Sequence, residues 1–101
     1  MKEKDIEKEV CEYAEKLGFL VRKFTSPTTI AVPDRIFWGH SQCFLIEFKS
    51  PTGRLHAAQE REIQRIRNHG GKVFIVDNVE DGKLIIDGAY SVGKKIYAYQ
   101  R

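Results

Sequence analysis

Hydrophobic positions over the first seventeen residues recur at the spacing of an amphipathic helix. The apolar stripe consists of Ile6, Val10, Tyr13, Ala14 and Leu17. Glu and Lys fill most of the positions between them, so one helical face is apolar and the other charged. Gly18 follows at the position where glycine commonly ends a helix. The pattern predicts a helix over residues 1–17.

Apolar runs after this helix predict three strands. Residues 19–25, FLVRKFT, form the first run. The next two are DRIFW, residues 34–38, and CFLIEFK, residues 43–49, and GHSQ lies between them. Four residues of this composition are typical of a tight turn. We expect the second and third runs to form an antiparallel hairpin.

A second helix and a fourth strand complete the clear pattern. Leu55–His69 carries apolar residues at helical spacing and is followed by two glycines. Residues 72–77, KVFIVD, are nearly all apolar, which is typical of a strand covered on both faces. In the tail, KLIID at 83–87 indicates a short strand, and GKKIYAYQR at 93–101 an edge strand or a loose end.

This order of elements, α-β-β-β-α-β, predicts an α/β fold in which helices flank a mixed sheet. A length of 101 residues suffices for a single domain with one modest core. The net charge of +3 permits a polyanionic partner without requiring one.

The sequence lacks the features of a membrane or secreted protein, and this determines the expected compartment and the expected state of the two cysteines. It has no apolar run of membrane-spanning length, and its N-terminal segment is too charged for a secretory signal. We expect a cytoplasmic protein with no membrane partner. Cys11 and Cys43 are then expected to be reduced, buried thiols.

The run CFLIEFK carries charge on a face that should be partly covered. Alternation divides its side chains into Phe44, Ile46 and Phe48 on one face and Leu45, Glu47 and Lys49 on the other. Leu45 indicates that the second face is at least partly buried. A buried charge is costly unless it is paired or bound to a metal. Glu47 and Lys49 therefore indicate a functional site, although an ordinary salt bridge on a solvated face is the alternative.

Asp34 adds a second carboxylate to this site. If residues 39–42 form the turn, Asp34 lies opposite Glu47, because each is the same distance from the turn. Adjacent carboxylates repel unless a positive charge lies between them. Oxygen ligands with retained waters suit Mg²⁺ or Mn²⁺, which polarise phosphate and acidify bound water. Lys49 would orient that water or stabilise developing negative charge.

The sequence resembles the VRR-NUC domains of the PD-(D/E)xK nuclease superfamily, especially the stand-alone type of phages and bacteria. The matching segments are KEKDIEKEV near the N-terminus, AVPDR at 31–35, FLIEFKSPTGRL at 44–55, Gln59, and GGKVFIVD at 70–77. The likeness spans about residues 1–79 of the single domain 1–101. It implies a restriction-endonuclease-like core and leaves 80–101 as a C-terminal extension of uncertain structure.

The resemblance implies a metal site held by Asp34 and Glu47, with Lys49 assisting the attacking water. It also implies a metal-binding glutamate from the first helix. Glu7 is the first choice, because it lies beside the apolar stripe and eleven residues before the helix-ending glycine. Glu3, one turn earlier, is the alternative.

Gln59 and several cations complete the implied site. Gln59 shares the apolar face of the second helix and would bond a catalytic group or a phosphate; a boundary residue is the alternative. Candidate phosphate contacts are Arg22, Lys23, Arg35, Arg54 and the loop from Ser50 to Gly53. No aromatic platform for base stacking is evident, which favours recognition through the DNA backbone and shape.

These features predict a Mg²⁺-dependent endonuclease that hydrolyses phosphodiester bonds, with Mn²⁺ also supporting activity. The resemblance favours branched DNA such as Holliday junctions. A homodimer would supply two active sites to a two-fold symmetric junction. The alternatives are a nuclease without junction preference, of flap or restriction type, and a non-catalytic DNA-binding module with the same fold.

Overall fold

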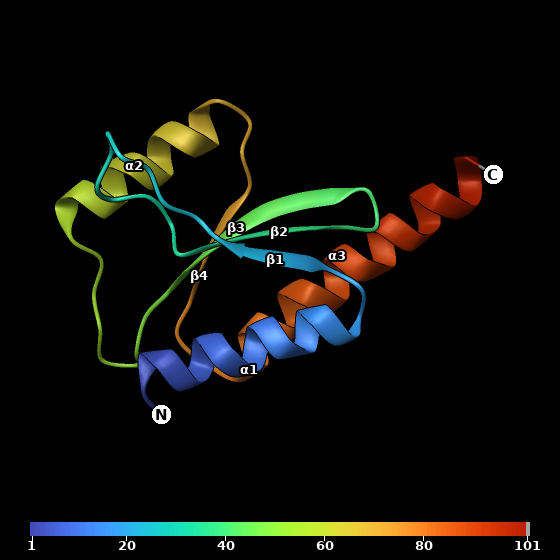
Figure 1. The fold of residues 1–101 in the computed structure, drawn as a ribbon, viewed down its shortest axis with the longest axis horizontal. Helices are drawn as coiled ribbons and strands as arrows, with labels where there is room; N and C mark the ends of the chain where they lie inside the picture. Colours follow the sequence, from blue (N-terminus) through green and yellow to red (C-terminus); the bar gives the residue numbers. More distant parts are fainter. Residues whose placement is uncertain (101) are drawn as a thin grey trace.

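The computed structural model describes residues 1–100, with side-chain environments through Gly93. Its elements are α1 (Glu3–Lys16), β1 (Leu20–Lys23), β2 (Arg35–Gly39), β3 (Gln42–Phe48), α2 (Ala57–Asn68), β4 (Val73–Val76) and α3 (Val79–Gln100) (Figure 1). The strands form one sheet in the order β1-β2-β3-β4. The first three are antiparallel and β4 runs parallel to β3, which confirms the predicted mixed sheet.

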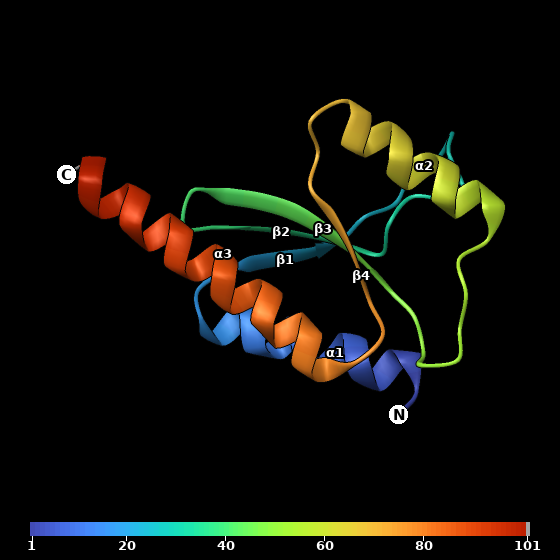
Figure 2. The same cartoon turned by 180° about the vertical axis from the view of Figure 1, so that it is seen from behind.

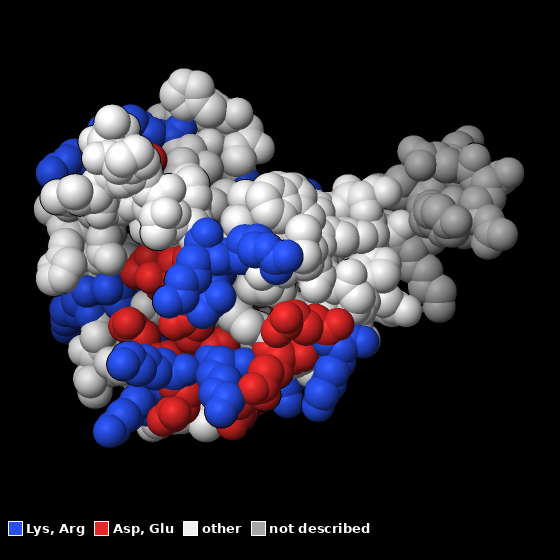
Figure 3. Space-filling model, in the orientation of Figure 1, with Lys and Arg blue, Asp and Glu red and all other residues white. Residues whose placement is uncertain are grey.

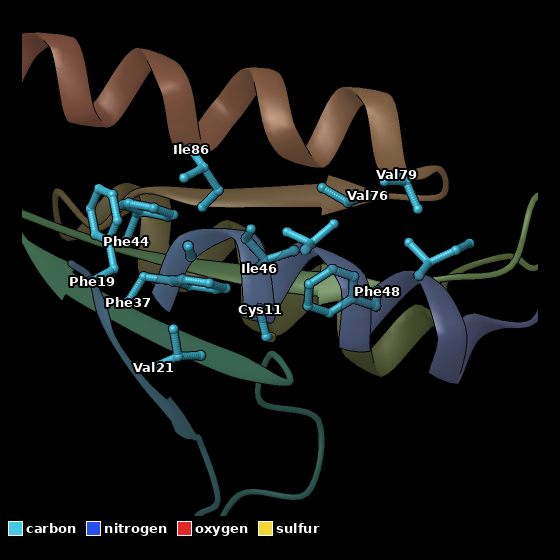
Figure 4. Packing of buried hydrophobic residues seen from close by; sticks show 13 residues of the cluster. Cys11, Phe19, Val21, Phe37, Phe44, Ile46, Phe48, Val76, Val79 and Ile86 are labelled. Atoms are coloured by element: carbon cyan, nitrogen blue, oxygen red, sulfur yellow. The ribbon is translucent and has the colours of Figure 1, made fainter. Parts of the chain in front are cut away.

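The helices divide between the two faces of this sheet. Figures 1 and 2 show α1 and α3 side by side on one face and α2 alone on the other. The larger core lies beneath α1 and α3, where Phe37, Phe44, Ile46 and Phe48 are at most 2% exposed (Figure 4). A smaller core, centred on Leu45, Ile63 and Val73, lies beneath α2. The alternation predicted for β3 is thereby confirmed.

The hairpin turn forms at the predicted place. Gly39 pairs with Gln42, and His40 and Ser41 between them have φ values of 51° and 63°. Positive φ at both central residues matches the right-handed twist of the flanking strands. Gly93 of α3 packs against this turn, because a Cβ atom there would lie 1.7 Å from the His40 carbonyl oxygen.

The tail differs from the predicted short strands. Residues 79–100 form one helix, whose N-terminus is capped by the Asn78 side chain accepting the Asp81 N–H at 2.8 Å. The three glycines within it disguised the helical pattern, because glycine disfavours helix interiors. Gly82 is nonetheless required for packing, since a Cβ atom there would lie 2.4 Å from Val10 of α1. Arg101, the last residue of the expected edge strand, lies outside the described residues.

Two predictions of burial are wrong. Ile75 in β4 is 44% exposed, so this edge strand is not covered on both faces. Cys43 is exposed, whereas Cys11 is buried as expected. On this face α2 covers Leu45 and Val73 and leaves Ile75 and Cys43 uncovered. Among the described residues, no helix has the length and hydropathy needed to cross a membrane.

Candidate active site

Asp34 lies directly before β2 and is fixed by two backbone contacts. Its carbonyl oxygen accepts the Phe24 N–H at 3.0 Å, and its Oδ2 accepts the Phe48 N–H at 2.7 Å. In this register Pro33 lies opposite Phe48, beyond the last pair of the strand ladder. The Asp34 carboxylate therefore accepts the Phe48 N–H at the point where the ladder ends. The same register, carried one step beyond its last pair, places Asp34 opposite Glu47 as predicted.

Glu47 and Lys49 lie on the α2 side of β3. Glu47 is 3% exposed, and its Oε2 lies 3.5 Å from Lys49 Nζ. The Lys49 side chain is 13% exposed, so the pair is shielded from water. The structure thus favours a buried charged site over a solvated salt bridge.

Gln59 connects α2 to this pair. Its Nε2 donates to Glu47 Oε2 at 3.1 Å. Its Oε1 accepts the backbone N–H of His56, the residue that precedes α2, at 2.9 Å. Because the Gln59 amide oxygen is bonded to the His56 N–H at the start of the helix, the amide nitrogen faces Glu47. Gln59 is therefore in the position that the sequence indicated.

The two first-helix glutamates have different surroundings. Glu7 Oε2 accepts from Arg35 Nε at 2.6 Å, so both members of this pair are partly neutralised beside Asp34. Glu3 is exposed, and its charge helps to raise the pKa of both Asp34 and Glu47. Glu7 also helps to raise the pKa of Asp34, and more strongly than Glu3 does, while it is engaged with Arg35.

The candidate DNA contacts lie in two grooves beside the site and on β1. Asp34, Lys23 and Arg35 line a groove of about 630 Å³ along α1. Lys49 and Arg54 line another of about 470 Å³ on the other side of the site.

The remaining two candidates lie nearby. Ser50 directly follows Lys49 and begins a turn in which its carbonyl oxygen accepts the Gly53 N–H at 2.9 Å. Arg22 is exposed on β1, on the side of the sheet that α2 covers.

Burial and mutual repulsion destabilise the charged forms of both site carboxylates. Burial, followed by the charge of Asp34, raises the pKa of Glu47 to about 7, against the opposing effect of Lys49. Burial also raises the pKa of Asp34, while the N–H of Phe48 lowers it. Perturbed carboxylates that share a half-buried position are typical of functional sites.

This donor set fits a divalent cation in part. A cation between Asp34 and Glu47 would relieve their repulsion, and Mg²⁺ usually takes one or two carboxylates together with waters and phosphate oxygens. Among the described side chains, no three carboxylate, imidazole or thiol groups converge closely enough to enclose a metal. The predicted trio of Glu7, Asp34 and Glu47 is thus not assembled in this conformation.

The fold and the site together define a class of protein. A mixed four-stranded sheet flanked by helices, with two carboxylates and a lysine at the ends of its central strands, is a restriction-endonuclease-like core.

The profile of the VRR-NUC domain family matches residues 4–80, and the chain belongs to this family of nuclease domains. A solved structure described as a VRR_NUC domain is 28% identical, with a TM-score of 0.78 over 86% of this chain and 96% of that one. No curated protein matches the chain. A nuclease domain implies DNA as the substrate.

One exposed side chain near the site was not singled out by the sequence. Trp38 is 42% exposed, although the sequence predicts only an apolar strand for the run that contains it. The available signal was alternation: Phe37 is buried under α1 and α3, so its neighbour must point to the α2 side.

Proposed function

We propose that this protein is a Mg²⁺-dependent DNA endonuclease whose catalytic centre is Asp34, Glu47 and Lys49. The supporting observation is the buried Glu47, held opposite Asp34 and 3.5 Å from Lys49 Nζ. Buried charges contribute little net stability, so their presence at this position favours a chemical role.

Each residue has a definite task in this proposal. A divalent ion bound by Asp34 and Glu47 would polarise the scissile phosphate and acidify a water molecule, and Mn²⁺ would serve as well as Mg²⁺. Lys49 stabilises negative charge on the phosphate or orients the water. Gln59 holds the Glu47 carboxylate in place. Glu3 is better placed than Glu7 as the third carboxylate, because Arg35 already engages Glu7.

The distribution of charge supports DNA binding on the α2 side. Residues 18–76 contain nine Lys and Arg against four Asp and Glu, two of which are the site carboxylates. Residues 1–17, which include α1, contain four basic and six acidic residues. Figure 3 shows acidic side chains gathered over the lower part of the molecule, where α1 lies in Figure 1. The phosphate backbone therefore has its most favourable approach over the sheet and α2.

The proposed substrate is branched DNA, cut by a homodimer. Two copies of the domain would present two active sites to the two strands of a symmetric junction. A flap or restriction-type nuclease and a non-catalytic module are the competing functions. The retained Asp34, Glu47 and Lys49 speak against the non-catalytic module.

One set of assays separates these functions. The protein is incubated with four-way junction, flap, duplex and single-stranded DNA in Mg²⁺, in Mn²⁺ and in EDTA, and its mass is measured by sedimentation. We expect cleavage only with metal, fastest at the junction, by a dimer. Absence of cleavage on every substrate would reject the nuclease. Equal rates on all substrates would reject the junction preference alone.

A further inference from the structure

The sheet face that carries the site is left open at its hairpin end. Trp38 pairs with Leu20 of β1 on one side and with Cys43 of β3 on the other, so the three side chains form a row across three strands. Trp38 is 42% exposed, Leu20 is 47% exposed and Cys43 is also exposed. We call these three residues the hairpin patch.

This patch and the catalytic centre lie on the same face of the sheet, and the row between them, Ile36 and Leu45, is packed beneath α2. Cys43 and Glu47 are both on β3 and are four residues apart, so they share a face of the strand. At about 3.3 Å per residue they are separated by about 13 Å, roughly the rise of four base pairs in duplex DNA. A DNA strand cut at Glu47 would reach Trp38 by passing beside α2, along the exposed edge formed by β1.

One exposed basic side chain lies between the two positions on β1, an edge strand of the sheet. Arg22 is exposed and lies two residues from Leu20 on the same face. Lys23, the next residue, points to the opposite face of the sheet, where it lines the groove along α1 that also contains Asp34. The sequences of β1 and β2 contain no acidic residue, and Glu47 is the one acidic residue of β3. The apolar, aromatic patch is thus followed on the same face by one exposed cation, Arg22, on the side toward the site.

We propose that the hairpin patch binds an unpaired nucleobase of the DNA substrate, stacked on the Trp38 indole. Arg22 contacts the phosphates of the strand that leads from this base to Asp34. The inference rests on the proposed function, since it assumes that DNA is the substrate. Stacking on an exposed aromatic ring is tolerant of sequence, because every base has a π-face.

The observations favour DNA over a second copy of the chain as the occupant. Stable protein interfaces bury about 800 Å² on each partner, much more than three side chains supply. A second copy centred on this patch would also bring Arg22 near its own counterpart, with no acidic residue of β1 or β2 to compensate. A DNA strand offers phosphates to Arg22 and a base to the aromatic ring.

Trp38 is the single tryptophan of the chain, so its fluorescence reports directly on the patch. The test titrates the protein with a single-stranded oligonucleotide in EDTA, which prevents cleavage. We expect saturable quenching by this oligonucleotide and weaker quenching by blunt duplex. An abasic oligomer of equal length, which offers phosphates without bases, should leave the fluorescence nearly unchanged.

Variants assign the binding to the ring. Trp38→Ala should weaken single-strand binding about tenfold, measured by anisotropy of labelled DNA, and Trp38→Phe should restore most of it. Arg22→Ala should weaken binding to the normal and abasic oligomers alike. The matched control is Leu84→Ala, an apolar residue 67% exposed on α3, which should bind normally.

Three results would overturn the inference: no quenching by single strands, equal quenching by the abasic oligomer, or unchanged affinity in Trp38→Ala. A fluorescence change that follows protein concentration without DNA, together with a doubled mass, would assign the patch to a second copy. Quenching without cleavage in Mg²⁺ would reject the nuclease and leave the patch intact. Cleavage without quenching would reject the proposed role of the patch and leave the proposed nuclease activity intact.

Discussion

At the scale of single residues, the site depends on groups that are held in place by backbone atoms. Asp34 is fixed by the N–H of Phe48, and Gln59 by the N–H of His56. Neither side chain is free to turn away from Glu47. Preorganised polar groups of this kind lower the cost of stabilising charge during a reaction.

The proposed chemistry is tested by removing charge from the central pair. Glu47→Gln and Lys49→Ala should each lower the cleavage rate by at least about 100-fold, because each removes a group that acts on the reacting phosphate. DNA affinity in EDTA should stay within a few-fold of wild type. Wild-type cleavage by either variant would show that the catalytic centre lies elsewhere.

The third carboxylate is identified by comparing Glu3→Ala with Glu7→Ala. Glu3 acts on both Asp34 and Glu47, whereas Glu7 acts on Asp34 and is paired with Arg35. We expect Glu3→Ala to lose more activity at limiting Mg²⁺ and to recover part of it as Mg²⁺ is raised. A larger loss in Glu7→Ala, also recovered by Mg²⁺, would restore the original assignment to Glu7.

The two thiols should differ sharply in reactivity. Burial raises the pKa of Cys11 to about 12, so almost no thiolate is present near neutral pH. Cys43 is exposed. A maleimide should modify one thiol per native chain, located at Cys43 by peptide mass spectrometry, and two after denaturation. Rapid native labelling of Cys11 would contradict the buried position of α1.

At the scale of elements, the N-terminus of α2 both begins a helix and orients the site. Gln59 performs both tasks, one with each atom of its amide. These tasks can be separated, because glutamate accepts the same N–H in a helix capping box but, when ionised, donates nothing to Glu47.

Gln59→Glu should therefore keep the cap of α2 and still lose activity, by about tenfold or more. Gln59→Ala should lose activity and also stability, by about 1 kcal/mol, because the cap is removed. Gln64→Glu makes the same change on the exposed outer side of α2 and should have little effect. Cleavage kinetics and urea unfolding measure the two effects. Full activity in Gln59→Glu would limit Gln59 to capping.

Local patterns predicted the elements well where backbone and side-chain preferences agree. Alternation and turn length placed Asp34, Glu47 and Lys49 correctly, because register in a two-residue hairpin follows from the turn. The exposure of Cys43 and Trp38 could not be predicted, since it depends on how far α2 extends over the sheet. The tail was misread because the glycines that break its helical pattern serve contacts with Val10 and His40.

At the scale of the whole molecule, α3 connects parts of the chain that are far apart in sequence. Gly82 lies against α1, and Gly93 lies against the turn between β2 and β3. The helix thereby fixes the first helix, the hairpin and, through the hairpin, the strands that carry Asp34 and Glu47.

Gly93→Ala should destabilise the fold by about 1–3 kcal/mol, because a Cβ atom would overlap the His40 carbonyl oxygen and force α3 outward. Gly88→Ala is the matched control in the same helix. A Cβ atom at Gly88 meets no described atom within 4 Å, so this change should stabilise by about 0.5–1 kcal/mol. Urea unfolding of the two variants gives the comparison. Equal effects would contradict the close packing of Gly93.

The unequal division of charge between α1 and the rest of the chain has a kinetic consequence. Near a polyanion such a molecule experiences a torque as well as an attraction, so it turns its sheet and α2 toward the nucleic acid before any contact forms. Productive collisions then make up a larger share of all encounters at low ionic strength. Added salt, by shortening the range of that field, removes the orientation first and the attraction afterwards.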